Sequence, residues 1–126
     1  MSKSTFEDLE VFQAAVDLMV DVYRVSESYP KREMYGLVSQ MRRASVSVVS
    51  HIAEGQGRLT FGEWRQMLSQ GRGSLYEIEA QTIASLRLGY IDDASYAQLR
   101  QKTKSVASRL AGLIHYVQRN DRTKRR

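Results

Sequence analysis

Apolar residues recur at intervals of three and four along most of the chain, the spacing that places side chains on one face of an α-helix. The first such segment runs from about residue 9 to residue 26. It carries two adjacent apolar lines: Leu9, Phe12, Val16, Met19 and Tyr23 on one, and Val11, Ala15, Leu18 and Val22 on the other. Pro30 disfavours helical geometry at the residue before it, so this helix should end earlier. Because it is apolar over a wide arc, the helix needs more than one surface to pack against.

Three further segments repeat the pattern, over about residues 34–54, 61–88 and 93–119. Four long helices joined by short connections predict an all-α, antiparallel up-down four-helix bundle. We expect one bundle domain over residues 1–119. Residues 120–126, which are rich in arginine, should form a basic disordered tail.

Glycine and capping residues mark the ends of these segments. We expect Gly55 and Gly89 to end the second and third helices in the left-handed conformation that closes many helices. Thr60, followed three residues later by Glu63, predicts a capping box at the start of the third helix. Asp92 is a suitable N-cap for the fourth helix.

Two glycines also lie inside the third segment. Gly71 and Gly73 should each cost about 1 kcal/mol relative to alanine in a helix interior. Such a cost is tolerable where a backbone must approach another element closely, so we expect a close helix contact here.

Charge is unevenly distributed along the chain, whose formal net charge is +5. Residues 1–30 hold two basic side chains against six acidic ones, whereas residues 95–126 hold nine against one. A basic surface attracts polyanions by neutralising phosphates and releasing counterions; alternatively, a charged tail only keeps the surface solvated. We expect Arg42 to be a better surface contact than Arg43. The candidate nucleic-acid contacts are Lys31, Arg32, Arg42, Arg58, Arg100, Lys104, Arg122, Lys124, Arg125 and Arg126.

Polar residues form stripes beside the apolar lines of the second and third helices. The stripes predict a hydrogen-bonded layer that sets helix register or a subunit contact. Arg43 is a natural partner for Glu77 or Glu54 in such a layer. The alternative is that both stripes face water. The predicted structural polar network consists of Gln40, Arg43, Ser47, Glu54, Ser74 and Glu77.

Catalytic and metal-binding motifs are absent from the sequence. The chain has no cysteine and two histidines, which excludes thiolate sites and a histidine-rich metal site. Gly55-Gln56-Gly57 lacks the lysine and the preceding strand of a phosphate-binding loop. His51 and Glu54 share a helix face, but no second Glu-x-x-His pair exists to complete a di-metal site. We expect no catalytic residue, no metal and no cofactor.

No targeting signal or membrane span is evident. Glu7, Asp8 and Glu10 follow the first residues where a signal peptide would place an apolar region. No apolar run approaches the ~20 residues that a membrane span needs. We therefore expect a cytoplasmic protein with no membrane partner.

The stretches Gly36–Ser47 and Ile52–Gly55, supported by Gly73–Glu77 and Leu88–Ile91, resemble a known family. These are the small four-helix-bundle proteins encoded within intervening sequences of bacterial 23S ribosomal RNA genes. The resemblance spans roughly residues 6–117, and His51 stands where the family's motif has asparagine. The residues that match the family's signature are Gly36, Gln40, Arg43, Ser47, Glu54, Gly55, Gly73, Ser74 and Glu77.

The resemblance implies a ring-forming homopentamer with no established enzymatic activity. The related accessory variability proteins of diversity-generating retroelements form a basic barrel that binds nucleic acid and a reverse transcriptase. We therefore expect a non-enzymatic, oligomeric adaptor that binds RNA or DNA mainly through phosphates, and a nucleic-acid-acting protein as a further partner. Two alternatives stay open: a protein-interaction scaffold with no nucleic-acid role, and an enzyme with an inter-subunit pocket that uses Glu54 or Glu77.

Overall fold

The computed structural model describes residues 9–121, which fold into four α-helices and one short 3₁₀ helix. The elements are α1 (Glu10–Ser26), η2 (Lys31–Glu33), α2 (Leu37–Gln56), α3 (Phe61–Arg87) and α4 (Asp93–Arg119). No strand occurs among these residues. The prediction of an all-α fold with four helices is confirmed, and the short helix η2 was not predicted.

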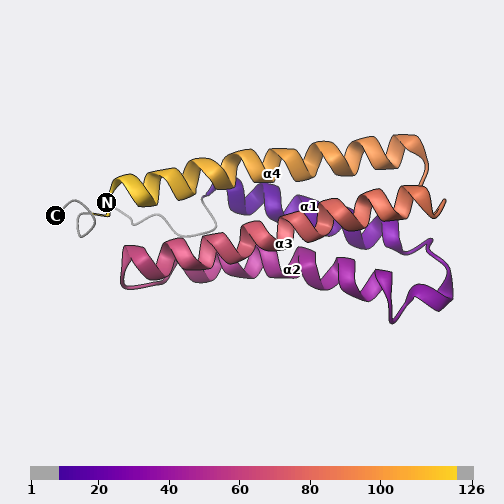
Figure 1. The fold of residues 1–126 in the computed structure, drawn as a ribbon, viewed down its shortest axis with the longest axis horizontal. Coiled ribbons are helices and arrows are strands. Elements are labelled where there is room, and N and C mark those ends of the chain that lie inside the picture. The colour runs from indigo at the N-terminus through magenta and orange to yellow at the C-terminus, as the bar shows by residue number, and fades with distance from the viewer. Residues whose placement is uncertain (1–8, 122–126) are drawn as a thin grey trace.

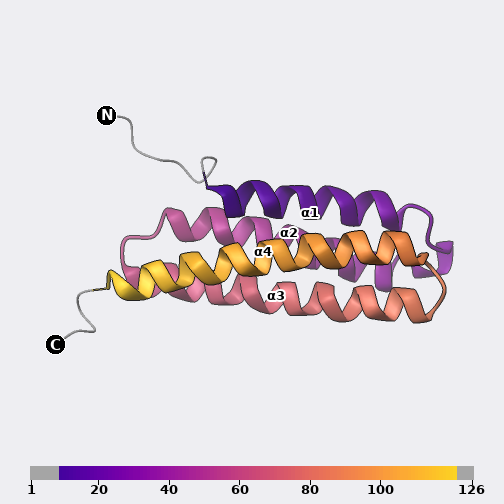
Figure 2. The ribbon, with the colours of Figure 1, turned by 90° about the horizontal axis from the view of Figure 1, so that it is seen from above.

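The four α-helices lie side by side along one long axis (Figure 1). The α1–α2 and α3–α4 connections lie at one end of this axis, and the α2–α3 connection lies at the other (Figures 1 and 2). Both α1 and α3 pack against α2 and α4. The helices therefore form a bundle in which neighbours in the sequence are also neighbours in space.

One of the two apolar lines of α1 supplies its core residues. The buried line is Val11, Ala15, Leu18 and Val22. In the other line Phe12, Val16 and Met19 are half-buried, and Tyr23 is exposed. Tyr23 lies on the side of α1 that faces α2, because the guanidinium carbon of Arg42 sits 4.7 Å from its ring centroid.

The predicted apolar lines of α2, α3 and α4 face the core, except that Phe61, the first residue of the predicted α3 line, is exposed. Their fully buried side chains are Met41, Val48, Ile52, Leu68, Ile78, Leu99, Val106, Leu110 and Val117. Burying a side chain of this size contributes roughly 1.5–3 kcal/mol relative to leaving it exposed. Buried Thr82 and Thr103 satisfy their hydroxyls by donating to carbonyls of their own helices, each at 2.7 Å.

Three predicted helix ends are confirmed. The Thr60 side chain accepts from the amide of Glu63 at 3.1 Å, which is the N-cap half of the predicted capping box, and Asp92 Oδ1 accepts from the amide of Ser95 at 2.8 Å. The Glu63 side chain makes no return hydrogen bond to Thr60 among the described residues. Gly89, at φ 78°, follows the last turn of α3, and its amide donates to the carbonyl of Leu86. The left-handed conformation there favours glycine because it has no Cβ.

The other glycine predictions need correction. α2 continues past Gly55, which is buried against the next helix: a Cβ there would lie 2.8 Å from Cδ1 of Trp64. This glycine therefore allows close packing and does not cap the helix. Gly71 is buried, and a Cβ would meet His51 Cβ at an ordinary 3.5 Å, whereas Gly73 is exposed with nothing within 4 Å.

The chain remains attached to the bundle beyond the end of α4. Asn120 Nδ2 donates to the carbonyl of Tyr116 at 2.7 Å. Asp121 is buried, and its carboxylate lies 3.4 Å from Nη1 of Arg65. These two residues were predicted to belong to a disordered tail; the rest of that tail, Arg122–Arg126, lies outside the described residues. Within residues 9–121, no helix combines the length and apolar character that a membrane span needs.

Candidate nucleic-acid interface

The predicted basic contacts are spread over the bundle. Lys31 and Arg32 lie in η2, at the end that holds the α1–α2 connection, and Arg58 lies in the α2–α3 connection at the opposite end (Figure 1). Lys104 is exposed in α4. The structure does not bring these four side chains together, and the tail residues Arg122, Lys124, Arg125 and Arg126 lie outside its described range.

Arg42 links α1 to α2 and does not extend into solvent. Its Nε donates to Ser26 Oγ at 2.9 Å, and Nη2 donates to the carbonyl of Tyr23 at 3.2 Å. The guanidinium also stacks over the Tyr23 ring. The preference for Arg42 over Arg43 as a surface contact is therefore reversed, since Arg43 is exposed and has no hydrogen bond or ion pair within residues 9–121.

Arg100 is also held within the chain. Its Nη2 donates to Glu79 Oε2 at 3.1 Å, which joins α4 to α3, and its Nη1 donates to the Tyr96 hydroxyl at 3.1 Å. The guanidinium of Arg100 therefore neutralises the charge of the Glu79 carboxylate. Lys104, one turn further along α4, is left exposed and pairs with no described carboxylate.

A groove of about 230 Å³ runs between α3 and α4 beside Lys104. Two of its exposed side chains were not predicted from the sequence: Arg72 and Tyr76, one turn apart on α3. The i, i+4 spacing of an arginine and a tyrosine, outside the apolar line of the helix, was the available signal. We call the groove lined by Arg72, Tyr76, Glu79, Lys104, Ala107 and Ala111 the α3–α4 groove.

The predicted polar network is formed only in part. Ser74 Oγ donates to Ser47 Oγ at 2.8 Å across the α2–α3 contact, and Ser47 Oγ lies 3.0 Å from His51 Nδ1. The other four members are exposed, and their side chains form no hydrogen bond or ion pair with residues 9–121: Gln40, Arg43, Glu54 and Glu77.

The predicted pairing of Arg43 with Glu77 or Glu54 therefore does not occur within the chain. The α2–α3 contact is filled by small residues, including buried Gly55 and Gly71 and the Ser47–Ser74 pair. Longer side chains are displaced to its outer edge, where water competes for them. Their use in a subunit contact stays a prediction.

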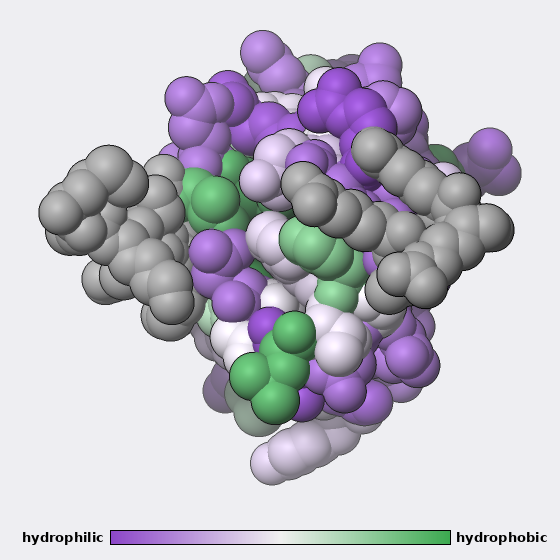
Figure 3. Space-filling view, turned by 90° about the vertical axis from the view of Figure 1, so that its left-hand side faces the viewer, coloured by the Kyte–Doolittle hydropathy of each residue, from purple (hydrophilic) through white to green (hydrophobic). Residues whose placement is uncertain are grey.

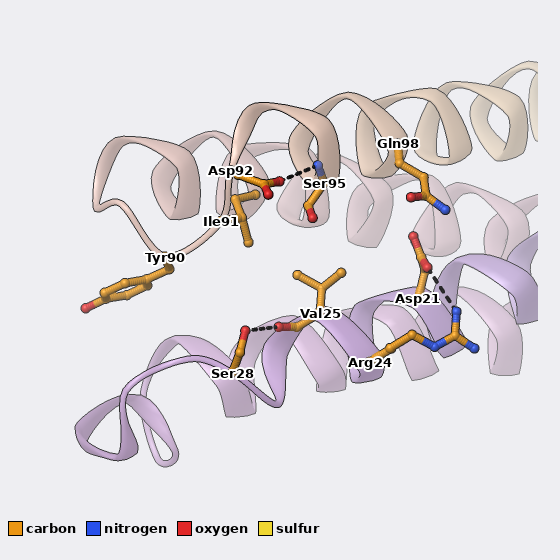
Figure 4. A pocket seen from close by; sticks show the side chains of 9 residues that line it. All are labelled: Asp21, Arg24, Val25, Ser28, Tyr90, Ile91, Asp92, Ser95 and Gln98. Atoms are coloured by element: carbon orange, nitrogen blue, oxygen red, sulfur yellow. Dashed lines mark hydrogen bonds and ion pairs between the residues drawn. The ribbon is translucent and has the colours of Figure 1, made fainter.

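A second hollow, of about 390 Å³, lies between α1 and α4 (Figure 4). Asp21, only 3% exposed, points into it from α1, and Asp92 borders it at the start of α4. Asp21 Oδ1 lies 3.6 Å from both Arg24 Nη1 and Lys102 Nζ, and Oδ2 has no hydrogen-bond partner among the described residues. Arg24 and Lys102 already face the Asp21 carboxylate, so neither is left unpaired for a phosphate in this hollow.

A tyrosine–carboxylate contact fixes the turn that carries Lys31 and Arg32. The Tyr90 hydroxyl donates to Glu33 Oε2 at 2.7 Å, and the Leu37 amide donates to Glu33 Oε1. The Tyr90 hydrogen bond, followed by the Leu37 amide, holds the pKa of the Glu33 carboxyl below its ordinary value. The same hydrogen bond raises the pKa of the Tyr90 phenol.

The end of the bundle that holds the α2–α3 connection exposes apolar side chains among hydrophilic ones (Figure 3). Leu59 is 96% exposed, and Phe61 and Tyr116 are also exposed beside a hollow of about 520 Å³. Arg58 is near this end, where its Nη2 donates to Met67 Sδ. The hollow combines apolar side chains with the Asp121 carboxylate, which Arg65 already pairs.

Metal-binding chemistry has no support in residues 9–121, where no group of three or more histidine, aspartate and glutamate side chains could hold an ion. Glu54 and Glu77 lie on outer surfaces.

Three comparisons with known proteins bear on this chain. The family model described as 23S rRNA-intervening sequence protein matches residues 7–112. A crystal structure of a protein with unknown function from the S23 ribosomal protein family of Bacteroides thetaiotaomicron has a similar fold, with a TM-score of 0.77 and 15% sequence identity. The match covers 83% of this chain and 95% of that one. No curated protein matches.

The structural likeness concerns the fold, because the sequence identity is low. The family model is a match of the sequence itself and covers most of the chain, including the α2 stretch and the Gly73–Glu77 stretch that suggested the resemblance. The chain therefore belongs to the family of 23S rRNA-intervening sequence proteins.

Proposed function

We propose that this protein is a non-enzymatic, self-associating adaptor that binds RNA or DNA through phosphates, with little base specificity. The observation that carries the proposal is the surplus of positive charge left on the surface. Lys31, Arg58 and Lys104 are exposed and pair with no carboxylate of residues 9–121. Because each ion pair uses one charge of each sign, pairing within the chain does not change its formal net charge of +5.

Self-association is supported by an apolar strip along α1 and α2. A single copy leaves Val20, Tyr23 and Val46 exposed, next to half-buried Val16 and Met19. A second copy that covered this strip would remove apolar area from water, at about 25 cal/mol per Å². The family resemblance favours a homopentameric ring; five copies at +5 each would carry a formal +25.

Binding of a labelled single-stranded RNA, measured by fluorescence anisotropy over a range of salt concentrations, tests the function. Phosphate binding predicts that the logarithm of the association constant falls linearly with the logarithm of salt concentration, with a slope of about −0.7 per neutralised phosphate. Binding that is absent at low ionic strength, or that salt does not weaken, would refute the proposal.

Light scattering on the eluting protein tests self-association. We expect wild-type protein to give the mass of an oligomer and Val46→Glu to give a smaller mass, because a carboxylate in the apolar strip would be buried unpaired. Gln101→Glu, at an exposed position of α4, adds a negative charge away from the strip and is the matched control. A wild-type protein with the mass of one chain at all accessible concentrations would contradict self-association.

A further inference from the structure

We propose that the α3–α4 groove binds single-stranded nucleic acid, with one base stacked on Tyr76 and the neighbouring phosphates on Arg72 and Lys104. This inference rests on the proposed function and assigns it a site. It is carried by an exposed aromatic ring, a local surplus of positive charge, and open space between the two helices.

The aromatic ring of Tyr76 is exposed and is not used in packing the bundle. Its side chain is 66% exposed, because it lies on the side of α3 opposite to the residues that α3 buries in the core. Its ring and hydroxyl form no ring contact or hydrogen bond with another residue of the described range. An unoccupied aromatic face on a basic surface is the feature on which proteins stack the bases of single strands.

Positive charge flanks this ring on both helices. Arg72 lies one turn before Tyr76 on α3, and Lys104 lies across the groove on α4; both are exposed and neither forms an ion pair in the described structure. Arg100 neutralises Glu79 at 3.1 Å. The groove therefore keeps a surplus of two positive charges, which suits two consecutive phosphates.

The α4 wall of the groove leaves room for a planar group. Ala107 and Ala111 lie one turn apart on α4, are exposed, and line the groove with Tyr76. Their methyl groups are too short to cover the tyrosine ring from across the groove. A base can therefore reach Tyr76 without displacing a large side chain.

The hollows between α1 and α4 hold no surplus of positive charge. One is lined by Asp21 and Asp92 against Arg24, and the other by Glu10 and Asp17 against Arg109. Counted with the bases that pair with its carboxylates, the first is balanced, because Lys102 also lies 3.6 Å from Asp21, and the second has one more carboxylate than cation. Neither holds a surplus of positive charge for a phosphate. Of these three interhelical hollows, only the α3–α4 groove attracts a nucleic-acid backbone.

The test measures binding of a fluorescein-labelled twelve-nucleotide oligouridine to the full chain by anisotropy at low salt. Tyr76→Ala should weaken binding about five- to 150-fold, the range expected for loss of one base–aromatic stack. Tyr76→Phe should retain wild-type affinity because stacking needs the ring and not the hydroxyl. Tyr35→Ala, which removes another exposed tyrosine, is the matched control and should change little.

The contributions of Arg72 and Lys104 are measured separately, by the salt dependence of binding. Arg72→Gln and Lys104→Gln should each make the salt slope less negative by about 0.7, the contribution of one phosphate contact on a single strand. Arg87→Gln, an exposed arginine in the last turn of α3, is their control and should leave the slope unchanged. Circular dichroism verifies that each variant remains helical.

The outcomes separate this inference from the proposed function. If wild-type chain binds oligouridine but the three groove variants bind like their controls, the groove is not the site, while phosphate binding itself stands. If wild-type chain does not bind at low salt, the proposed function fails and the groove fails with it. If an abasic oligonucleotide and polyglutamate compete as well as oligouridine does, the groove recognises charge alone, as an acidic protein partner would use it, and base stacking is refuted.

Discussion

The helix-interior glycines provide a direct test of how closely α2 and α3 pack. Gly73 and Gly112 are exposed within α3 and α4, and an added Cβ would have nothing within 4 Å. Replacing either with alanine should raise the free energy of unfolding by about 1 kcal/mol, because alanine restricts the unfolded backbone and favours the helix. No contact in the described structure opposes this gain.

Gly55→Ala should have the opposite effect. The new Cβ would lie 2.8 Å from Trp64 Cδ1 and 3.4 Å from Met67 Cβ, so the Trp64 ring or the backbone of α2 must move. Overpacking of this kind costs typically 1–3 kcal/mol. Because Gly55 lies in the last turn of α2, the gain in helix propensity is smaller than at Gly112, and we expect a net loss of about 1–2 kcal/mol.

Urea unfolding followed by circular dichroism at one fixed protein concentration measures these differences. Equal slopes against urea for wild type and variants would attribute the shifts in midpoint to stability. Gly71→Ala, whose Cβ would meet His51 at an ordinary 3.5 Å, should fall between the two extremes. The packing argument is refuted if Gly55→Ala is as stabilising as Gly112→Ala.

Three further substitutions test the core, the Ser74–Ser47 hydrogen bond and the Glu33–Tyr90 contact, each by urea unfolding. Leu110→Ala should lower the free energy of unfolding by about 2–5 kcal/mol, because Leu110 is fully buried and leaves a cavity. Ser74→Ala should lower it by about 0.5–1.5 kcal/mol through loss of the hydrogen bond to Ser47. Tyr90→Phe should reduce the pH dependence of stability at both extremes. The lowered pKa of Glu33 stabilises the fold above the carboxyl's ordinary value of 4.5 and is lost as pH falls through the folded value, whereas the raised pKa of Tyr90 stabilises it below 10.0 and is lost as pH rises through the folded value. If the free energy of unfolding of Tyr90→Phe falls at low and at high pH as steeply as that of the wild type, this hydrogen bond does not contribute to stability.

Local chemistry allowed most of the fold to be predicted from the sequence. The helix spacing, the capping side chains of Thr60 and Asp92 and the left-handed Gly89 each depend on residues within one turn. Such signals are readable because the hydrogen bonds they form are local. Gly55 was misread for the opposite reason: its role depends on Trp64, which belongs to the next helix.

The face of α1 that points inward could not be chosen from its pattern. Both lines are apolar, both recur every 3–4 residues, and they are offset by one residue, so periodicity does not distinguish them. The choice depends on which neighbours are adjacent: α2 covers part of the Phe12–Tyr23 line, and Arg42 caps its end by stacking on Tyr23. The apolar side chains of α1 that stay exposed are Val20 and Tyr23, and their burial by a second copy stays a prediction.

The candidate interface was the least predictable part, because charge in a sequence does not show which side chains are already paired. Arg42 and Arg100 are long enough to reach partners on neighbouring helices. Arg42 bonds to Ser26, 16 residues away in the chain, and Arg100 bonds to Glu79, 21 residues away. Arg72 and Tyr76 line a groove only because α4 lies beside them and carries Lys104 and small residues at the facing positions. The sequence of α3 alone does not show this.

The apolar strip and the α3–α4 groove lie on opposite sides of the bundle. α1 and α2 are neighbours, as are α3 and α4, and each pair packs against the other (Figure 2). Copies that associate through the α1–α2 side would therefore leave the α3–α4 side of every copy accessible. A closed ring needs two different contact surfaces on each copy, and the strip would supply one of them. The exposed polar residues along α2 and α3, Gln40, Arg43, Glu54 and Glu77, form the adjacent outer face, where a neighbour's side chains could provide the partners that these four do not find within their own chain.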